Sequence, residues 1–401
     1  MTTRNTTNGK RAPCALVGYG ETPFAKARDS QGRSHYTEQC RAARRAIQDA
    51  GLTKDDIDGL VAISPIDQTA SWSQDLAEYL QLRCRFIDSL YFGGGSGNAG
   101  ILYAAAAIEA GLCQTVLLVG GSVFDPLTAG DYGKEDTVPF ERDFDTPYGP
   151  MLDNSAYALI KQRYQYEFDA PDEAFAQITV NARYHAARFP NALLKTELSV
   201  PEVLQSRMIC DPLHMYEIVM PCTGASALIL TAGDRVRDLP HRPVYLLGGG
   251  QSFDRGMWTP AYGRDPSLTT SPVKAAAAQA FAQSGLTIND MDFAQLYDCY
   301  SVTVVISLED IGCCPKGEGA RYVAETDLTF AGKMPVNTDG GQLGRGQPYG
   351  ACHFMGTVEG VRQLMGRAGP LQVADARCGL VNGNGGSMAN ECTLILGNEL
   401  P

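Results

Sequence analysis

Residues 337–354 read NTDGGQLGRGQPYGACHF and run directly into an apolar, helix-like segment at residues 355–365. Five of these eighteen residues are glycine. Glycines allow positive φ angles and a close approach of backbone to ligand, and the start of the following helix offers unpaired N–H groups to an oxyanion. Asn337, Gln347, Tyr349 and His353 add polar side chains. The stretch predicts a binding or catalytic loop, although an ordinary glycine-rich turn would have the same composition.

The chain around this loop repeats one order of elements twice. The first copy has a strand at 15–20, a helix at 37–49 closed by Gly51, a Leu-Thr turn with acidic residues, and a strand at 59–63. The second copy has a strand at 245–250, a helix at 274–283 closed by Gly285, the same kind of turn, and a strand at 293–297. A duplication of such long period excludes a solenoid and predicts two similar α/β halves.

Each half continues with a glycine-rich loop, an apolar helix and a buried strand. These lie at residues 93–97, 98–111 and 115–121 in the first half, and at 340–350, 352–367 and 378–383 in the second. Helices that are apolar on most sides belong in the middle of a layered structure. Strands that are continuous apolar runs predict sheets covered on both faces.

The same pattern suggests a division of the chain into segments. We expect a flexible tail at residues 1–13, an N-terminal half at 14–235 and a C-terminal half at 240–401. The first half carries an insertion at 123–211 that is richer in charged and aromatic residues, with helices predicted at 148–168 and 172–189. An insertion of this size is typical of a lid or a pocket wall.

The composition excludes several classes of function. A net charge of −12 disfavours nucleic acid or an anionic membrane as partner, and the longest apolar run is too short to cross a bilayer. The chain has 12 cysteines but no C-x-x-C pair and no zinc-like Cys/His spacing, so no metal site is expected. Without a signal peptide, reduced thiols indicate a cytoplasmic protein.

Local motifs resemble the thiolase superfamily, in its sterol-carrier-protein and lipid-transfer-protein branch. The matching segments are HAARFPNA at 185–192, DPL at 211–213, PCTGASAL at 221–228, LED at 308–310, GCCPKGEG at 312–319 and NTDGG at 337–341. The resemblance covers nearly the whole chain from about residue 14. It implies the thiolase fold, a duplicated five-layer α-β-α-β-α arrangement with an inserted loop domain.

The catalytic positions depart from the thiolase pattern. A thiolase uses a Cys nucleophile at the end of the first glycine loop, because acyl transfer passes through a thioester on the enzyme. Here Gly94 takes that place, and Gln347 replaces the activating His of the Gly-His-Pro motif. The Asn-Glu-Ala-Phe motif reads Tyr297-Asp298-Cys299-Tyr300, and the late catalytic Cys is missing from residues 381–386. Thiolysis by the usual route is therefore not expected.

Members of this branch that lack the nucleophile resemble retro-aldolases, which cut a β-hydroxyacyl-CoA into a carbonyl compound and a shorter acyl-CoA. The resemblance implies Tyr297 as the acid/base, with Asp298 beside it to orient or polarise the site. It leaves open whether Gln347 or Tyr349 takes the place of a second aldolase tyrosine. Gln347 cannot act as a base, but its amide can donate to an oxyanion. His353, at the start of the helix, is a further catalytic candidate.

The glycine loops supply the candidate substrate-binding positions, which are Gly94, Ser96, Asn337, Gly341 and Asn384. The resemblance also implies a CoA thioester as substrate, no cofactor bound by this chain, a homodimer, and a small zinc-ribbon/OB-fold partner protein. His185 and Arg188 on the insertion are expected on a solvated face or at a pocket edge.

Two other functions stay open. One is acyl transfer by a thiolase-like route with a relocated nucleophile such as Cys352. The other is a non-catalytic subunit that binds lipid or CoA.

Overall fold

The computed structural model describes residues 13–65, 71–124, 153–254 and 268–400, together with the isolated residues 143, 147 and 149. The predicted tail up to residue 12 and most of the insertion before residue 153 lie outside the described residues, so the division into tail, halves and insertion stays a prediction. Within the described residues, no helix combines the length and apolar character needed to cross a bilayer.

The first half forms its elements in the predicted order. They are β1 (Ala15–Glu21), α1 (His35–Asp49), β2 (Gly59–Ile63), α2 (Trp72–Leu80), β3 (Phe86–Leu90), α3 (Ser96–Glu109), β4 (Thr115–Ser122) and β8 (Gly224–Thr231). A Ser34 capping box starts α1, which satisfies backbone N–H groups that the helix leaves free. Strands β2, β4 and β8 are buried at every position, as expected for a sheet covered on both faces.

The second half repeats this order. Its elements are β9 (Val244–Phe253), α10 (Val273–Ser284), β10 (Phe293–Leu296), α11 (Ser301–Asp310), α12 (Gly319–Glu325), α13 (Gly341–Arg345), α14 (Cys352–Leu364), β12 (Cys378–Gly385) and β13 (Asn390–Gly397). Gly285 ends α10 in the left-handed conformation, which glycine adopts without steric cost.

The nine strands form one sheet in the order β10-β12-β13-β9-β1-β8-β4-β2-β3. Corresponding strands of the two halves lie equally far from the junction between β9 and β1, on opposite sides of it. The pairs are β9 and β1, β13 and β8, β12 and β4, and β10 and β2. The junction is narrow, because β1 and β9 pair at only Ala15 with Tyr245 and Leu16 with Val244. The predicted duplication is therefore visible in the strand order.

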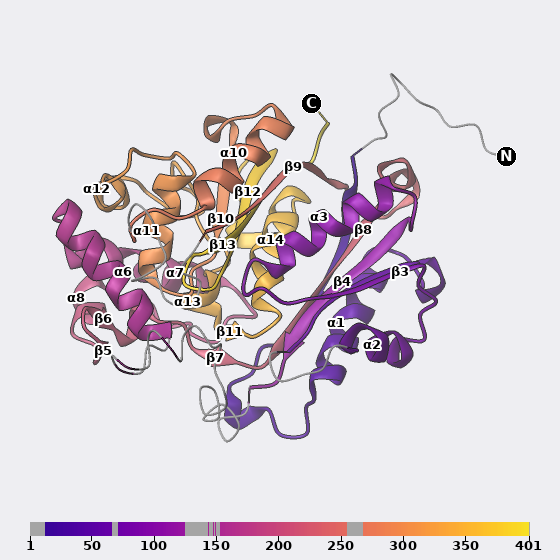
Figure 1. Cartoon of the computed structure of the whole chain (residues 1–401), viewed down its shortest axis with the longest axis horizontal. Helices are drawn as coiled ribbons and strands as arrows, with labels where there is room; N and C mark the ends of the chain where they lie inside the picture. The colour runs from indigo at the N-terminus through magenta and orange to yellow at the C-terminus, as the bar shows by residue number, and fades with distance from the viewer. Residues whose placement is uncertain are drawn as a thin grey trace.

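Helices divide the structure into the five expected layers (Figure 1). Helices α1 and α2 cover the outer face of the first half-sheet. Helices α3 and α14 lie between the two half-sheets and share a core with strands from both. Helices α10 and α11 pack in the core on the far side of the second half-sheet. The two glycine-rich loops precede these central helices, so the layering brings the loops together.

The two central helices approach closely at their N-termini. A Cβ atom on Gly97 of α3 would lie 2.1 Å from the carbonyl oxygen of His353 in α14, so only glycine permits this contact. The loop before α3 and the loop before α14 thus face each other across the junction of the halves.

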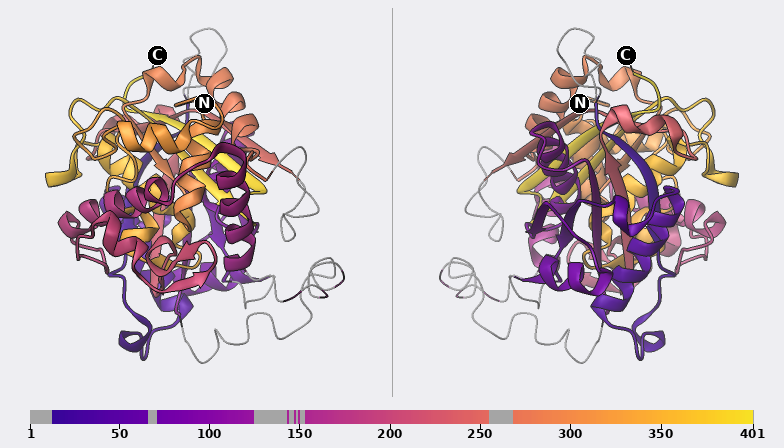
Figure 2. Two further views of the ribbon diagram at one scale, coloured as in Figure 1. Left: turned by 90° about the vertical axis from the view of Figure 1, so that its left-hand side faces the viewer. Right: turned by 90° about the vertical axis from the view of Figure 1, so that its right-hand side faces the viewer.

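The insertion adds α6 (Asp153–Phe168), α7 (Asp172–Arg188) and α8 (Val200–Leu204). Although it belongs to the first half in sequence, α7 packs against α11, α12 and α13 of the second half (Figure 2, left). In α6, Tyr157 stacks on Tyr300 and the Tyr164 hydroxyl donates to Glu309 inside the core.

A buried ion network also joins the halves. Arg345 of α13 is fully buried and donates to Glu21 of β1 at 2.7 Å and to Asp339. Arg362 of α14 binds the other oxygen of Glu21 at 2.9 Å and Glu359 at 2.5 Å. Burial alone would raise the pKa of Glu21, but the guanidinium groups of Arg345 and Arg362 hold it below its ordinary value.

Candidate active site

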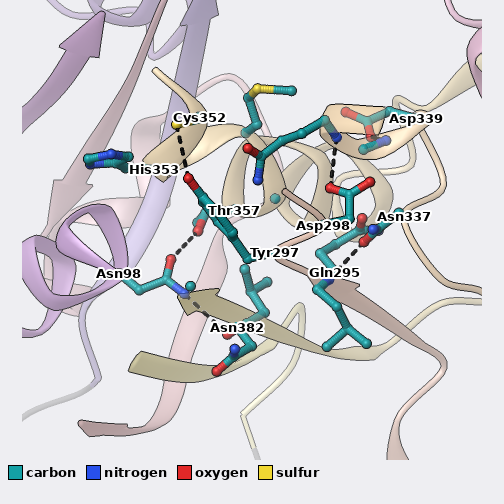
Figure 3. A pocket seen from close by; sticks show the side chains of 17 residues that line it. Asn98, Gln295, Tyr297, Asp298, Asn337, Asp339, Cys352, His353, Thr357 and Asn382 are labelled. Atoms are coloured by element: carbon teal, nitrogen blue, oxygen red, sulfur yellow. Dashed lines mark hydrogen bonds between the residues drawn. The ribbon is translucent and has the colours of Figure 1, made fainter. Parts of the chain in front are cut away.

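Tyr297 follows the last residue of β10 and projects toward the loop that precedes α3. Its phenol oxygen lies 3.4 Å from the sulfur of Cys352 (Figure 3). It also accepts a hydrogen bond from the Gln347 side-chain amide at 3.3 Å. Burial raises its pKa well above the ordinary tyrosine value, and the nearby thiols of Cys352 and Cys299 raise it further. The phenol is therefore neutral at physiological pH.

The ring of Tyr297 occupies the space above Gly94. A Cβ atom on Gly94 would lie 2.3 Å from two atoms of the ring and 2.2 Å from the carbonyl oxygen of Asn384. Any side chain at position 94, including a cysteine, is thus excluded while the tyrosine stands where it does. The structure thus brings Gly94, Tyr297 and Gln347 together, while the catalytic and substrate-binding roles expected of them stay predictions.

Asp298, like Tyr297, follows the end of β10, and its side chain points away from the Tyr297 ring (Figure 3). Its carboxylate is buried and accepts the backbone N–H of Gln342 at 2.8 Å and of Leu343 at 3.2 Å. Gly341 is needed next to it, because a Cβ there would lie 2.2 Å from Asp298 Oδ2. Burial raises the pKa of Asp298 to about 7, although the two N–H groups oppose the shift. Asp298 therefore fixes the start of α13 and titrates near neutrality.

His353 lies beside the site but lacks the properties of a base in this state. It is buried, its Nδ1 has no hydrogen-bond partner among the described residues, and burial lowers its pKa to about 3. Tyr349 is partly exposed and lies near Tyr300, and it is not among the residues that line the cavity described below. The catalytic roles of His353 and Tyr349 stay predictions.

The predicted substrate-binding residues are mostly engaged in holding the loops. Ser96 donates to the Gly93 carbonyl at 2.5 Å and accepts the Phe92 N–H at 2.9 Å. Asn337 accepts the Leu296 N–H at 2.7 Å, and Asn384 accepts the Met388 N–H at 3.2 Å. The contribution of these three residues to substrate binding stays a prediction.

His185 is buried, so the solvated face, one of its two expected places, was wrong. Its Nε2 accepts the Phe330 N–H at 2.9 Å, which leaves the proton on Nδ1 to donate to the Asn337 carbonyl, also at 2.9 Å. Burial lowers its pKa to about 4. The neutral imidazole thus positions Asn337, whose φ of 51° turns the chain into the glycine loop. Arg188, in contrast, is a surface residue that pairs with Glu197.

A small cavity of about 20 Å³ adjoins the phenol (Figure 3). Its polar lining includes side chains that the sequence analysis did not single out, namely Asn98 of α3, Gln295 of β10, Gln342 of α13, Thr357 of α14 and Asn382 of β12. Only Gln342 carried a signal in the sequence, because it follows Gly341 in the glycine loop. The other four come from elements whose sequence predicts a core.

The thiol of Cys352 contacts the phenol of Tyr297. It is buried, and burial raises its pKa to about 12 although the contact with Tyr297 opposes the shift. Because the thiolate is the nucleophilic form, this environment does not activate it. No cluster of His, Cys, Asp and Glu that could hold a metal ion occurs among the residues the structure describes.

Comparisons with known proteins place this site in a family. Residues 255–398 match the family described as Thiolase C-terminal domain-like. The 17-hydroxy-3-oxo-4-pregnene-20-carboxyl-CoA lyase of Mycobacterium tuberculosis is 31% identical over 362 residues, which cover 88% of this chain and 91% of the lyase. The chain belongs to the thiolase superfamily, in its lipid-transfer-protein branch. The thiolase fold expected from sequence is confirmed.

Two further members of the superfamily are similar to this chain over most of its length. The steroid side-chain-cleaving aldolase of Thermomonospora curvata is 31% identical over 366 residues, covering 88% of this chain and 90% of that protein. The solved structure of the Ltp2-ChsH2(DUF35) aldolase superposes with a TM-score of 0.85 at 30% identity, covering 96% of this chain and 98% of the other. These relatives are named lyases or aldolases, whereas the thiolase fold alone would allow many activities.

Proposed function

We propose that this chain is an aldolase of thiolase fold that cleaves a β-hydroxyacyl-CoA into a ketone or aldehyde and a shorter acyl-CoA. The relatives named for steroid side-chain cleavage support this reaction class, and the coenzyme A thioester is its substrate. The chain itself holds no cofactor, because the chemistry needs only proton transfer and stabilisation of an enolate.

One observation carries the proposal: the Tyr297 ring fills the space above Gly94 where a thiolase carries its nucleophile. A covalent acyl-enzyme cannot form at position 94, and the Tyr297 ring lies where a side chain at that position would stand. The site has therefore exchanged a sulfur nucleophile for a proton-transfer group.

Because the phenol of Tyr297 is neutral, it is better suited to relay a proton than to act as a free base. Its oxygen takes the proton of the substrate β-hydroxyl while its own proton passes to the α carbon. The electrons of the hydroxyl bond form the carbonyl as the bond between the α and β carbons breaks, and the phenol ends unchanged. Gln347 donates to the phenol oxygen and so holds it in place. Asp298 fixes α13 through its two N–H contacts.

The chain is further proposed to act in the cytoplasm as a homodimer with a small zinc-ribbon/OB-fold partner. The Ltp2-ChsH2(DUF35) aldolase, which combines a related chain with a second protein, supports a partner of this kind. The chain alone is expected to be inert or slow, so activity is to be measured with the partner present.

The test is Tyr297→Phe, assayed with partner and a β-hydroxyacyl-CoA for release of the carbonyl product. Loss of the relay should lower kcat by about 10²- to 10⁴-fold. Tyr300→Phe is the matched control, because its hydroxyl only donates to Asn154 at 2.7 Å, and it should keep the rate within a few-fold. Full activity of Tyr297→Phe would show that the assignment is wrong.

The thiol of Cys352, 3.4 Å from the phenol, gives the acyltransferase alternative its one structural support. An acyl adduct on Cys352 would favour it. A non-catalytic role would instead be favoured by measurable binding of acyl-CoA without turnover when the partner is present.

A further inference from the structure

The side-chain amides around the cavity at Tyr297 differ in whether their polar atoms have hydrogen-bond partners. Asn98 donates to the carbonyls of Val381 and Cys392 and accepts from Thr357. Asn382 donates to Glu391 and accepts from Thr393. Each of these amides is thus committed to the fold through both of its polar atoms.

Gln295 and Asn337 are also engaged. Gln295 donates to the Thr338 hydroxyl at 2.9 Å, and Asn337 accepts the Leu296 N–H at 2.7 Å. Four of the five cavity amides therefore serve to hold strands and helices together.

Gln342 is the exception. Its side chain is 3% exposed and lines the same cavity, yet its Oε1 has no hydrogen-bond partner among the residues that the structure describes. A buried carboxamide oxygen without a hydrogen bond is costly, since it has given up its contacts with water. The described residues therefore leave this oxygen free for a donor that they do not supply.

The backbone of Gln342 is fixed, so the free oxygen is not the result of a loose loop. Its N–H donates to Asp298 at 2.8 Å. Gly341, the residue before it, lies so close to Asp298 that a side chain at position 341 would not fit. The contact anchors the residue at the start of α13, next to the strand end that presents Tyr297.

The free oxygen of Gln342 and the size of the cavity define what can bind. That oxygen is an acceptor, so it is matched by a group that donates a hydrogen bond, which a hydroxyl does and a carbonyl does not. The cavity of about 20 Å³ holds one oxygen atom of the size of water or a hydroxyl, but no carbon skeleton.

We infer that Gln342 binds the β-hydroxyl of the substrate, with its unpaired carboxamide oxygen accepting from that hydroxyl in the cavity beside Tyr297. The inference rests on the proposed function: the one hydrogen of the hydroxyl faces Gln342 when the substrate binds and turns to the phenol when the relay begins. Gln342 is then the group that selects hydroxylated acyl-CoA over its deoxy analogue.

The experiment compares two ligands that differ only in the hydroxyl, 17-hydroxy-3-oxo-4-pregnene-20-carboxyl-CoA and its 17-deoxy counterpart. Their dissociation constants are measured by calorimetry on the complex with partner, in the Tyr297→Phe background that prevents turnover. Gln342→Leu should weaken the hydroxylated ligand by about five- to tenfold and leave the deoxy ligand within twofold. Gln342→Leu removes a buried amide whose oxygen is unpaired, so its melting temperature should not fall.

Gln295→Leu is the control, because it removes an amide from the lining of the same cavity, and that amide is already hydrogen-bonded to Thr338. It should lower the melting temperature and leave the ratio of the two dissociation constants unchanged. An equal loss for both ligands in Gln342→Leu, no loss for either, or the same change of ratio in Gln295→Leu would overturn the inference. Gln342 would then hold water only.

The two proposals fail in different ways. If the enzyme with partner cleaves the hydroxylated ligand but Gln342→Leu does not change the ratio, only the role of Gln342 is wrong. If Gln342 controls the ratio but no cleavage occurs, the site recognises the hydroxyl and the proposed reaction is wrong.

Discussion

The phenol oxygen of Tyr297 lies 3.4 Å from the sulfur of Cys352. Two groups that could each react with the substrate thus lie side by side. The protonation state of each group at neutral pH indicates which of them reacts. Burial raises the pKa of the thiol to about 12, so its thiolate is scarce at neutral pH. The phenol needs no ionisation to relay a proton, which favours the phenol as the reacting group.

The first prediction follows from this contrast. Wild-type enzyme incubated with a β-hydroxyacyl-CoA should carry no acyl group on Cys352 by mass spectrometry, and Cys352→Ala should retain turnover at a rate within about tenfold of wild type. The moderate loss would reflect poorer packing against Tyr297. Loss of all activity, together with an adduct in the wild type, would move the chemistry to the thiol.

Gly94→Ala should disturb the site through sterics alone. Its Cβ would meet the Tyr297 ring at 2.3 Å and the Asn384 carbonyl at 2.2 Å, so overpacking should cost about 1–3 kcal/mol of stability and displace the phenol. Gly95→Ala is the control, because its closest contacts are at 3.3 Å. Thermal melts and turnover of both variants check this, and equal behaviour of the two would contradict it.

Gln347→Leu should reduce turnover by removing the donor to the phenol oxygen. With the amide gone, the phenol loses a contact that holds it at 3.3 Å, and kcat should fall by about 10- to 100-fold with KM nearly unchanged. Steady-state kinetics measure both constants. A rise in KM at constant kcat would indicate that Gln347 only binds substrate.

Asp298 should make stability depend on pH near neutrality. Its folded pKa of about 7 lies above the ordinary value of about 3.9, so between these pH values the folded protein holds a proton that the unfolded chain has lost. Stability from this group is therefore lost as pH rises toward 7. Melting temperatures from pH 5 to 8 should fall more steeply for wild type than for Asp298→Asn, and parallel curves would contradict the assignment.

Glu21→Gln should destabilise the protein strongly, because it leaves the buried guanidinium groups of Arg345 and Arg362 with one carboxylate fewer. We expect a loss of about 3–5 kcal/mol in chemical denaturation. The folded pKa of Glu21 is lowered, so this contribution is present above its ordinary pKa and disappears as pH falls. Arg28→Gln, at an exposed ion pair, should change stability by no more than about 0.5 kcal/mol.

The layers were predictable from sequence because their signals are local. Apolar runs such as residues 115–122 and the glycine that ends each outer helix specify an element without reference to the rest of the chain. The repeat of these signals then predicted the two halves, and the resemblance to the thiolase superfamily implied functional positions at Gly94, Tyr297 and Gln347.

The details of the site could not be predicted in the same way, because they depend on contacts between distant residues. Nothing near Gly94 indicates that the Tyr297 ring covers it, and nothing near His185 indicates that Phe330 and Asn337 enclose its imidazole. Likewise, Gln342 looks like any polar loop residue until the engaged amides of Asn98 and Asn382 are seen around it.

The mirrored strand order about the β9–β1 junction has a consequence for the origin of the enzyme. A single ancestral half that paired with its own copy through this seam would have presented two equivalent loops to one another across a twofold axis. In the present chain Gly94 of one half carries no side chain and Tyr297 of the other half fills the space beside it, so the two halves of a duplicated fold contribute different parts to one site.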